Sequence, residues 1–104
     1  MGYQGWPNYE TWCVHLWLSN DEGTYRYCRA LAAECRAEAP NDQRVTDGVW
    51  PEADATKFLL SDRLKEFVTD LNPLSDEATM FADLMNAVLS EVDWHEVAEA
   101  FLEE

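Results

Sequence analysis

The segment from Gly5 to Asn20 constrains the fold most, because it places three of the five tryptophans within sixteen residues. Asn8 is a suitable N-cap, and Glu10 follows in the first turn, where the helix dipole favours a negative charge. We therefore predict a helix from about Tyr9 to Ser19 with one buried face. The side chains expected on that face are Tyr9, Trp12, Leu16 and Trp17.

Residues 1–7 contain two glycines and a proline, which predicts an extended lead-in before this helix. Tyr3 and Trp6 are expected to fold back onto the domain. Trp6 is placed to act as a hydrophobic staple at the entry of the helix.

Apolar residues recur at three- and four-residue spacing in four later segments, which predicts four further helices. Three span about residues 22–39, 51–71 and 76–90, and the last follows Asp93. Asp21 and Ser75 are predicted N-caps, and the tetrapeptide DWHE at 93–96 has the form of a capping box. The predicted core positions are Tyr25, Cys28, Leu31, Ala32, Cys35, Leu60, Leu64, Phe67, Val68, Leu71, Phe81, Leu84, Met85, Val88, Leu89, Trp94, Val97, Ala98, Phe101 and Leu102.

Residues 40–51, PNDQRVTDGVWP, have the composition of a long loop, with two prolines, a glycine and several turn formers. Val49 and Trp50 are expected to pack this loop onto the core. Exposed loops on rigid scaffolds often carry recognition, so a functional role for this loop stays open.

The chain as a whole predicts a single all-α domain, a compact bundle of four to five helices over residues 1–104. Its length is that of one domain, and no segment of convincing length alternates with the period of two that strands require. Neither a signal peptide nor an apolar run near the roughly 18 residues of a membrane span occurs. A cytoplasmic location is expected.

The charge balance is strongly negative, with 21 acidic residues against 7 basic ones and a net charge of −14. Such a field repels nucleic acid and anionic membranes and attracts basic surfaces, so a basic protein is the expected partner. Three arginines of the second predicted helix fall off its apolar stripe, and we expect them to pair with acids such as Glu22 and Glu38. These arginines are Arg26, Arg29 and Arg36.

The excess of acidic over basic residues is greatest towards the C-terminus, because no lysine or arginine follows Lys65. Acidic side chains one helical turn apart lie about 5–6 Å from one another. This is near the scale on which a DNA-binding cleft meets phosphates, which makes the acidic run a candidate DNA mimic. The alternative is a solvated surface with several carboxylates that stabilise helix N-termini. The candidate partner-binding residues are Glu66, Asp70, Asp76, Glu77, Asp83, Glu91, Glu96, Glu99 and Glu103.

Catalytic interpretations have less support. The sequence at His95, Glu96 and Glu99 reads HExxE, which lacks the second histidine of a zinc peptidase helix. Carboxylates such as Asp62 and Asp83 would form a metal site only through proximity in the fold. We therefore expect no catalytic residues, no metal and no cofactor.

The three cysteines are odd in number and lack CxxC spacing, so buried free thiols are expected. A metal site that combines them with His15 is the alternative, but it lacks the usual spacing of zinc ligands. The cysteines are Cys13, Cys28 and Cys35.

Two segments carry a resemblance to known sequences. The first segment, residues 5–25, contains the motifs GW, NYETW and LWL, followed by Asn20 and the motif GTY. The second segment, residues 84–98, has the sequence LMNAVLSEVDWHEVA. They resemble a family of small acidic, mostly uncharacterised proteins that recurs in phages, plasmids and bacterial genomes. Residues 36–75 show no such match. The resemblance implies a mobile-element setting without known catalytic residues, in which small acidic proteins include anti-restriction and anti-CRISPR inhibitors, some of them DNA mimics.

The first functional hypothesis is therefore a non-enzymatic inhibitor, with anti-CRISPR activity favoured, that binds a basic nucleic-acid-binding surface of a host defence complex through its carboxylates. The alternative is a helical interaction module that binds through exposed aromatic side chains, Tyr3 and Trp50, with the acids only solubilising it. An enzyme that acts on nucleotides through a carboxylate-bound metal is a third and less favoured hypothesis. No oligomeric state is predicted.

Overall fold

The computed structural model describes residues 2–103, which form helices and no strand. The elements are α1 (Tyr9–Asn20), α2 (Glu22–Glu38), a 3-10 turn η1 (Ala39–Asn41), α3 (Gln43–Thr46), α4 (Glu52–Leu71), α5 (Met80–Ser90) and α6 (Trp94–Leu102). The all-α prediction is confirmed. Five of the α-helices have nine or more residues, and α3 is a single turn.

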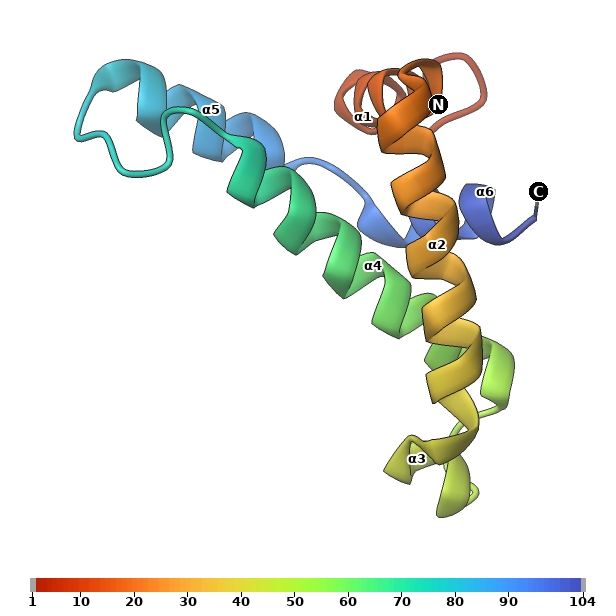
Figure 1. The fold of residues 1–104 in the computed structure, drawn as a ribbon. Helices are drawn as coiled ribbons and strands as arrows, with labels where there is room; N and C mark the ends of the chain where they lie inside the picture. Colours follow the sequence, from red (N-terminus) through yellow and green to blue (C-terminus); the bar gives the residue numbers. More distant parts are fainter. Residues whose placement is uncertain (1, 104) are drawn as a thin grey trace.

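The core lies where α2, α4 and α6 meet, with α4 crossing α2 and α6 in contact with both (Figure 1). The side chains of Leu60, Leu64 and Phe101 have no exposed surface. The predicted apolar stripe of α2 is confirmed from Cys28 to Cys35. Burial of apolar surface contributes roughly 25 cal/mol per Å², so this cluster is the main source of stability. Its members are Leu18, Cys28, Leu31, Ala32, Cys35, Leu60, Leu64, Val92, Val97, Ala98 and Phe101.

The buried face of α1 agrees only in part with the predicted one, since Trp12 and Leu16 are half-buried but Tyr9 and Trp17 are not. Tyr9 and Trp17 are 52% and 72% exposed, whereas Thr11 and Leu18 are buried and Val14 is partly buried against the core. Large apolar residues occur on every side of this helix, so spacing alone could not select the face that packs. The side chains that pack inward are those of Thr11, Val14 and Leu18, which are spaced by three and four residues.

The lead-in is a tight turn, not the extended segment that was predicted. Tyr3 and Trp6 exchange two backbone hydrogen bonds, with N···O distances of 2.6 and 2.8 Å. Gly5 has φ +86°, a conformation that favours glycine. The turn folds Trp6 back onto α1, where its ring lies 4.7 Å from that of His15.

The N-terminus of α1 is hydrogen-bonded to the turn that joins α5 and α6. The predicted cap Asn8 accepts from the Thr11 N–H at 2.9 Å and donates from Nδ2 to the Glu91 carbonyl at 2.7 Å. Thr11 Oγ1 in turn accepts the Asp93 N–H at 2.9 Å. The two segments singled out in the sequence, 5–25 and 84–98, therefore meet in the fold through atoms more than 80 residues apart.

Residues 40–51 are more ordered than a loop, since they contain part of η1 and all of α3. Asp42 caps α3 through the Arg44 N–H. Trp50 is half-buried and packs on Phe58, with ring centroids 5.4 Å apart. The prediction for Val49 is wrong, because it is 68% exposed. The backbone N–H groups of Val49 and Trp50 both donate to the Arg44 carbonyl. This tight turn directs the Val49 side chain outward.

The N-cap of α5 is Thr79 and not Ser75, since the Thr79 hydroxyl accepts from the Ala82 N–H at 3.1 Å. The intervening residues form turns, so α5 begins later than predicted. The C-terminal part of α4 from Glu66, this connection and α5 form an arm, residues 66–91, whose tip projects away from α1 and α2 (Figure 1). The radius of gyration is 14.8 Å, against about 13 Å for a compact chain of this length.

The predicted core stripe of α5 is largely solvent-exposed. Ala82 is buried and Leu89 half-buried, but the other apolar side chains are not covered. Leu71, at the end of α4, is likewise 59% exposed. Helical periodicity identified these apolar stripes correctly, but the arm extends away from the body, so no other element covers them. The exposed side chains of α5 are Met80, Phe81, Leu84, Met85 and Val88.

Candidate interaction surface

The arm carries most of the carboxylates singled out in the sequence. Six of the nine lie on it, in α4, in the connection and in α5 or at its C-cap: Glu66, Asp70, Asp76, Glu77, Asp83 and Glu91. The other three lie on α6 or at its C-cap: Glu96, Glu99 and Glu103. The structure thus separates the predicted set into an arm group and an α6 group.

The carboxylates of α4 form a ridge along one side of the helix. Asp62, Glu66 and Asp70 follow one another at intervals of four residues and line a shallow surface hollow of about 230 Å³ together with Lys65 and Thr69. Side chains at this spacing are about 5–6 Å apart. Asp62 was not among the predicted binding residues, although its four-residue offset from Glu66 was a signal for it.

A second hollow of about 280 Å³ adjoins the ridge on the side of α2. Glu66, Phe67 and Asp70 of α4 line it with Tyr27 and other residues. The Tyr27 and Phe67 rings are 4.5 Å apart and form an aromatic floor beside the two carboxylates. Apolar and acidic groups are therefore adjacent at this position.

Two acids at or in α6, Asp93 and Glu99, have local roles for their carboxylates. Asp93 caps the helix by accepting the Glu96 N–H at 3.2 Å, which confirms the aspartate half of the predicted capping box. Glu99 accepts from Lys57 of α4 at 3.1 Å, and this hydrogen bond raises the pKa of Lys57. Glu103 is the C-cap. The ion pair leaves Glu99 less negative towards a partner than an unpaired carboxylate would be.

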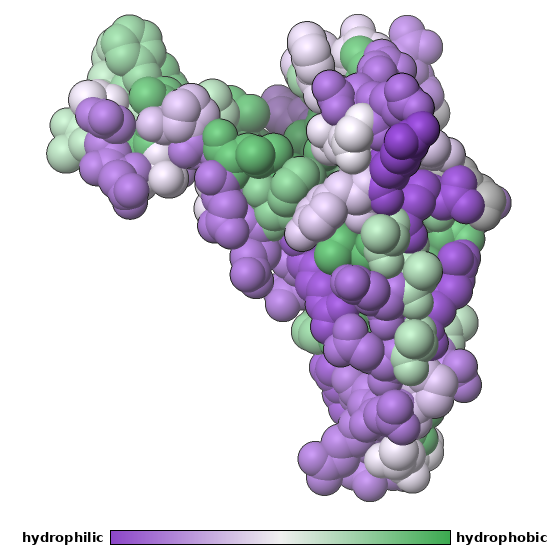
Figure 2. Space-filling view, in the orientation of Figure 1, coloured by the Kyte–Doolittle hydropathy of each residue, from purple (hydrophilic) through white to green (hydrophobic). Residues whose placement is uncertain are grey.

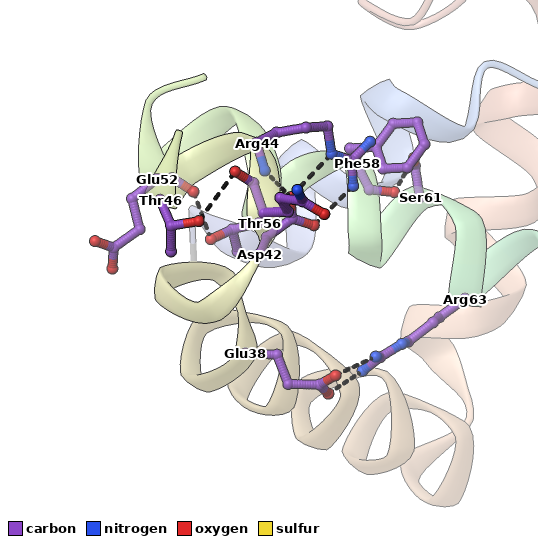
Figure 3. Close-up of polar contacts among 10 residues, drawn as sticks. Glu38, Asp42, Arg44, Thr46, Glu52, Thr56, Phe58, Ser61 and Arg63 are labelled. Carbon is purple, nitrogen blue, oxygen red and sulfur yellow. Dashed lines mark hydrogen bonds and ion pairs between the residues drawn. The ribbon is translucent and has the colours of Figure 1, made fainter. Parts of the chain in front are cut away.

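Two arginines bind carboxylates of the body in bidentate pairs (Figure 3). Arg63 donates to both oxygens of Glu38 at 2.6 and 2.7 Å, and these hydrogen bonds lower the pKa of Glu38. Arg44 donates to Asp42 at 2.9 and 2.7 Å and holds its pKa at about 2. The prediction that Glu38 pairs with an arginine of α2 is therefore wrong, because Arg63 of α4 reaches it.

The arginines of α2 have different partners. Arg26 pairs with Glu22 at 2.5 Å, as predicted. Arg29 donates to the Tyr25 hydroxyl at 3.0 Å, and Arg36 donates to the Leu102 carbonyl of α6. The cations thus concentrate on the body. Among the described residues, none of the six arm carboxylates forms an ion pair within 4.0 Å.

The exposed apolar side chains of α5 are a second feature of the arm. Met80 and Phe81 are 66% and 63% exposed, and Leu84 is 55% exposed. Figure 2 shows hydrophobic residues gathered at the far end of the arm and again where it joins the body, beside hydrophilic surface. Sequence reasoning assigned these residues to the core and so missed an apolar surface.

The aromatic residues of the alternative hypothesis differ in accessibility. Tyr3 is 39% exposed and packs on Tyr9 and Trp12, with ring centroids 5.3 and 4.9 Å away. Trp50 is half-buried, and the Arg44 guanidinium lies 4.3 Å from the centre of its ring. Trp50 therefore contributes to local structure as well as to surface.

The cysteines and the HExxE sequence form no joint site. Cys28 and Cys35 are buried free thiols, as predicted, while Cys13 is half-buried. Burial raises the pKa of Cys28 to about 11. Residues 2–103 contain no group of three His, Cys, Asp or Glu side chains arranged to hold a metal ion.

The described helices also include none with both the length and the apolar character needed to cross a bilayer. Neither a curated protein nor a solved structure matches the chain. A family model does match, over residues 1–99, and this segment contains the N-terminal turn, the arm and every member of the core cluster except Phe101. The chain therefore belongs to the family of unknown function DUF7249.

Proposed function

We propose that the protein is a non-enzymatic inhibitor that binds the basic nucleic-acid-binding surface of a host defence complex, a CRISPR effector being the first candidate. The observation that carries the proposal is the arm, which presents carboxylates without ion-pair partners among the described residues. Lysine and arginine side chains line sites that bind phosphates, so the same side chains suit this surface.

The geometry of the α4 ridge supports contact with such a site. Asp62, Glu66 and Asp70 are spaced by one helical turn each, so a single cationic groove can meet them together. The net charge of −14 adds long-range attraction that accelerates encounter. In α6 the Glu99 carboxylate is already paired with Lys57, so the proposal places the main contact on the arm.

A mobility-shift assay tests the proposal. Purified, guide-loaded CRISPR effectors of several types are mixed with labelled target DNA, and the protein is added in increasing amounts. At least one effector should lose its DNA. The double variant Glu66→Lys with Asp70→Lys should raise the half-inhibitory concentration at least about tenfold, because it reverses the ridge.

The matched control is Glu34→Lys with Asp47→Lys, which changes the net charge equally at exposed positions on α2 and beside α3. This control should inhibit within about threefold of the wild type, since only long-range attraction is reduced. Circular dichroism verifies that both variants remain helical. Equal loss of inhibition in the two variants would contradict a specific role for the arm, and retention of DNA by every effector would contradict the proposal.

A second candidate is an interaction module that binds through exposed aromatic side chains. Trp17 is 72% exposed. Tyr9 is 52% exposed, and its ring contacts that of Tyr3 in the lead-in. In this case Tyr3→Ala and Trp17→Ala would reduce inhibition in the same assay, and reversal of the ridge would not. The two candidates therefore make opposite predictions for one set of variants.

A further inference from the structure

α5 is the helix whose apolar residues the chain covers least. Its buried side comprises Ala82 and Leu89, and Leu89 lines a hollow against Lys65 and Thr69 of α4. With 3.6 residues per turn, a second apolar stripe runs along another side of the helix. That stripe consists of Met80, Phe81, Leu84, Met85 and Val88, which are between 36% and 66% exposed.

The stripe avoids charge in a chain of which 27% is charged. Asp83 is the one charged residue among the eleven of α5, and helical geometry places it well outside the stripe. A copy of the same stripe can therefore approach without opposing two carboxylates. This property distinguishes α5 from the α4 ridge, where a second copy would meet like charges.

The exposed area is sufficient for a small, specific interface. An aromatic side chain such as Phe81 carries roughly 150–250 Å². With the five residues of the stripe 36% to 66% exposed, the accessible area is on the order of 500 Å² per copy. Monomeric proteins rarely expose larger contiguous apolar patches than this. Two copies together would bury about 1,000 Å², which is the lower limit for a biological interface.

We propose that α5 is a homodimer interface, in which the stripes of two copies pack antiparallel across a two-fold axis. In this arrangement Phe81 of one copy lies beside Val88 of the other, and Leu84 lies beside Met85. The larger side chain of the first pair thus meets the smaller one, so the stripe is complementary to itself. This inference does not rest on the proposed function, which uses the carboxylates of the arm and not its apolar stripe.

The arrangement has an electrostatic signature. The N-terminal end of α5, next to Asp76 and Glu77, comes near Glu91 of the other copy. These like charges oppose dimerisation at low ionic strength and are screened within about 8–10 Å at physiological salt. Dimerisation should therefore strengthen or stay constant with added salt, whereas binding to a basic partner weakens.

Sedimentation equilibrium of the full chain, without any partner, tests the proposal at ~50 and ~500 mM NaCl. The expected mass at high concentration is twice the 12.0 kDa of the chain. Leu84→Glu should weaken the dimer at least about tenfold, because it places a charge at the centre of the interface. Asn86→Glu, which adds the same charge to α5 outside the stripe, should change the dissociation constant less than about threefold.

A chain that stays monomeric up to several hundred micromolar overturns the proposal, as does a dimer that Leu84→Glu leaves intact. Circular dichroism of each variant excludes unfolding as the cause. Since the assay contains no effector, its outcome is independent of the proposed function.

Discussion

At the scale of single residues, Thr11 is the position on which the relation between the two ends of the chain depends most. Its side chain is buried, and its hydroxyl both accepts the Asp93 N–H and donates to Asn8 Oδ1 at 2.6 Å. Asn8 in turn holds the Glu91 carbonyl. The helix cap Asn8 can be predicted from the sequence. The hydrogen bonds of Asn8 and Thr11 to a turn 83 and 82 residues away cannot, because no local pattern encodes those contacts.

Thr11→Val keeps the shape of the side chain and removes the hydroxyl, which leaves the Asp93 N–H without its acceptor. The expected loss is about 1–3 kcal/mol in the free energy of unfolding. Urea denaturation followed by circular dichroism measures it. Thr46→Val is the control, since Thr46 is exposed and should lose less than about 0.5 kcal/mol. Equal losses would contradict the assigned role of Thr11.

Asp42 makes the stability of the fold depend on pH. Hydrogen bonds from Arg44 lower its pKa in the folded chain from 3.8 to about 2. A lowered pKa means that the ionised form stabilises the fold, fully above about pH 3.8 and progressively less as the pH falls through about 2. Asp42→Asn should therefore reduce the melting temperature at neutral pH and have little effect near pH 2. A difference between the proteins that is constant from pH ~6 to ~2 would contradict this account.

At the scale of elements, helical periodicity located α2, α4 and α6 and their buried stripes from sequence. It also located α1 and α5, but it did not predict which of their faces is buried, for two physical reasons. α1 is apolar on every side, so no stripe stands out; α5 has a clear stripe, but periodicity does not say whether another element covers it. The acidic residues were found in the same way, as a run along the chain. Their separation into an arm group and an α6 group depended on tertiary contacts such as Lys57 with Glu99.

Two leucine truncations distinguish the covered elements from the exposed one. Leu64 of α4 has no exposed surface, whereas Leu84 of α5 is 55% exposed. Leu64→Ala should lower the free energy of unfolding by about 2–5 kcal/mol, because it leaves a cavity in the core. Leu84→Ala should lower it by less than about 1 kcal/mol, measured by urea denaturation at a low protein concentration. A comparable loss in both would show that α5 packs on the body.

At the scale of the whole molecule, the fold separates stability from recognition. The core and most cations lie in the body, which consists of α1, α2, α3, α6 and the first part of α4. The molecule measures 45 × 30 × 30 Å along its principal axes. Of the acidic residues behind the net charge of −14, those of the body are partly neutralised by arginines, whereas those of the arm face solvent without an ion pair among the described residues. This division gives the proposed inhibitor a surface that can change charge without loss of the fold.

The most direct test of this account is the affinity of the immobilised protein for a guide-loaded effector, measured by surface plasmon resonance in the absence of DNA. Between ~50 and ~300 mM NaCl the account predicts that the dissociation constant rises at least about tenfold, because added salt screens the attraction of the arm. The Glu66→Lys, Asp70→Lys variant should bind weakly at both salt concentrations. A dissociation constant that is the same at the two concentrations would contradict the account.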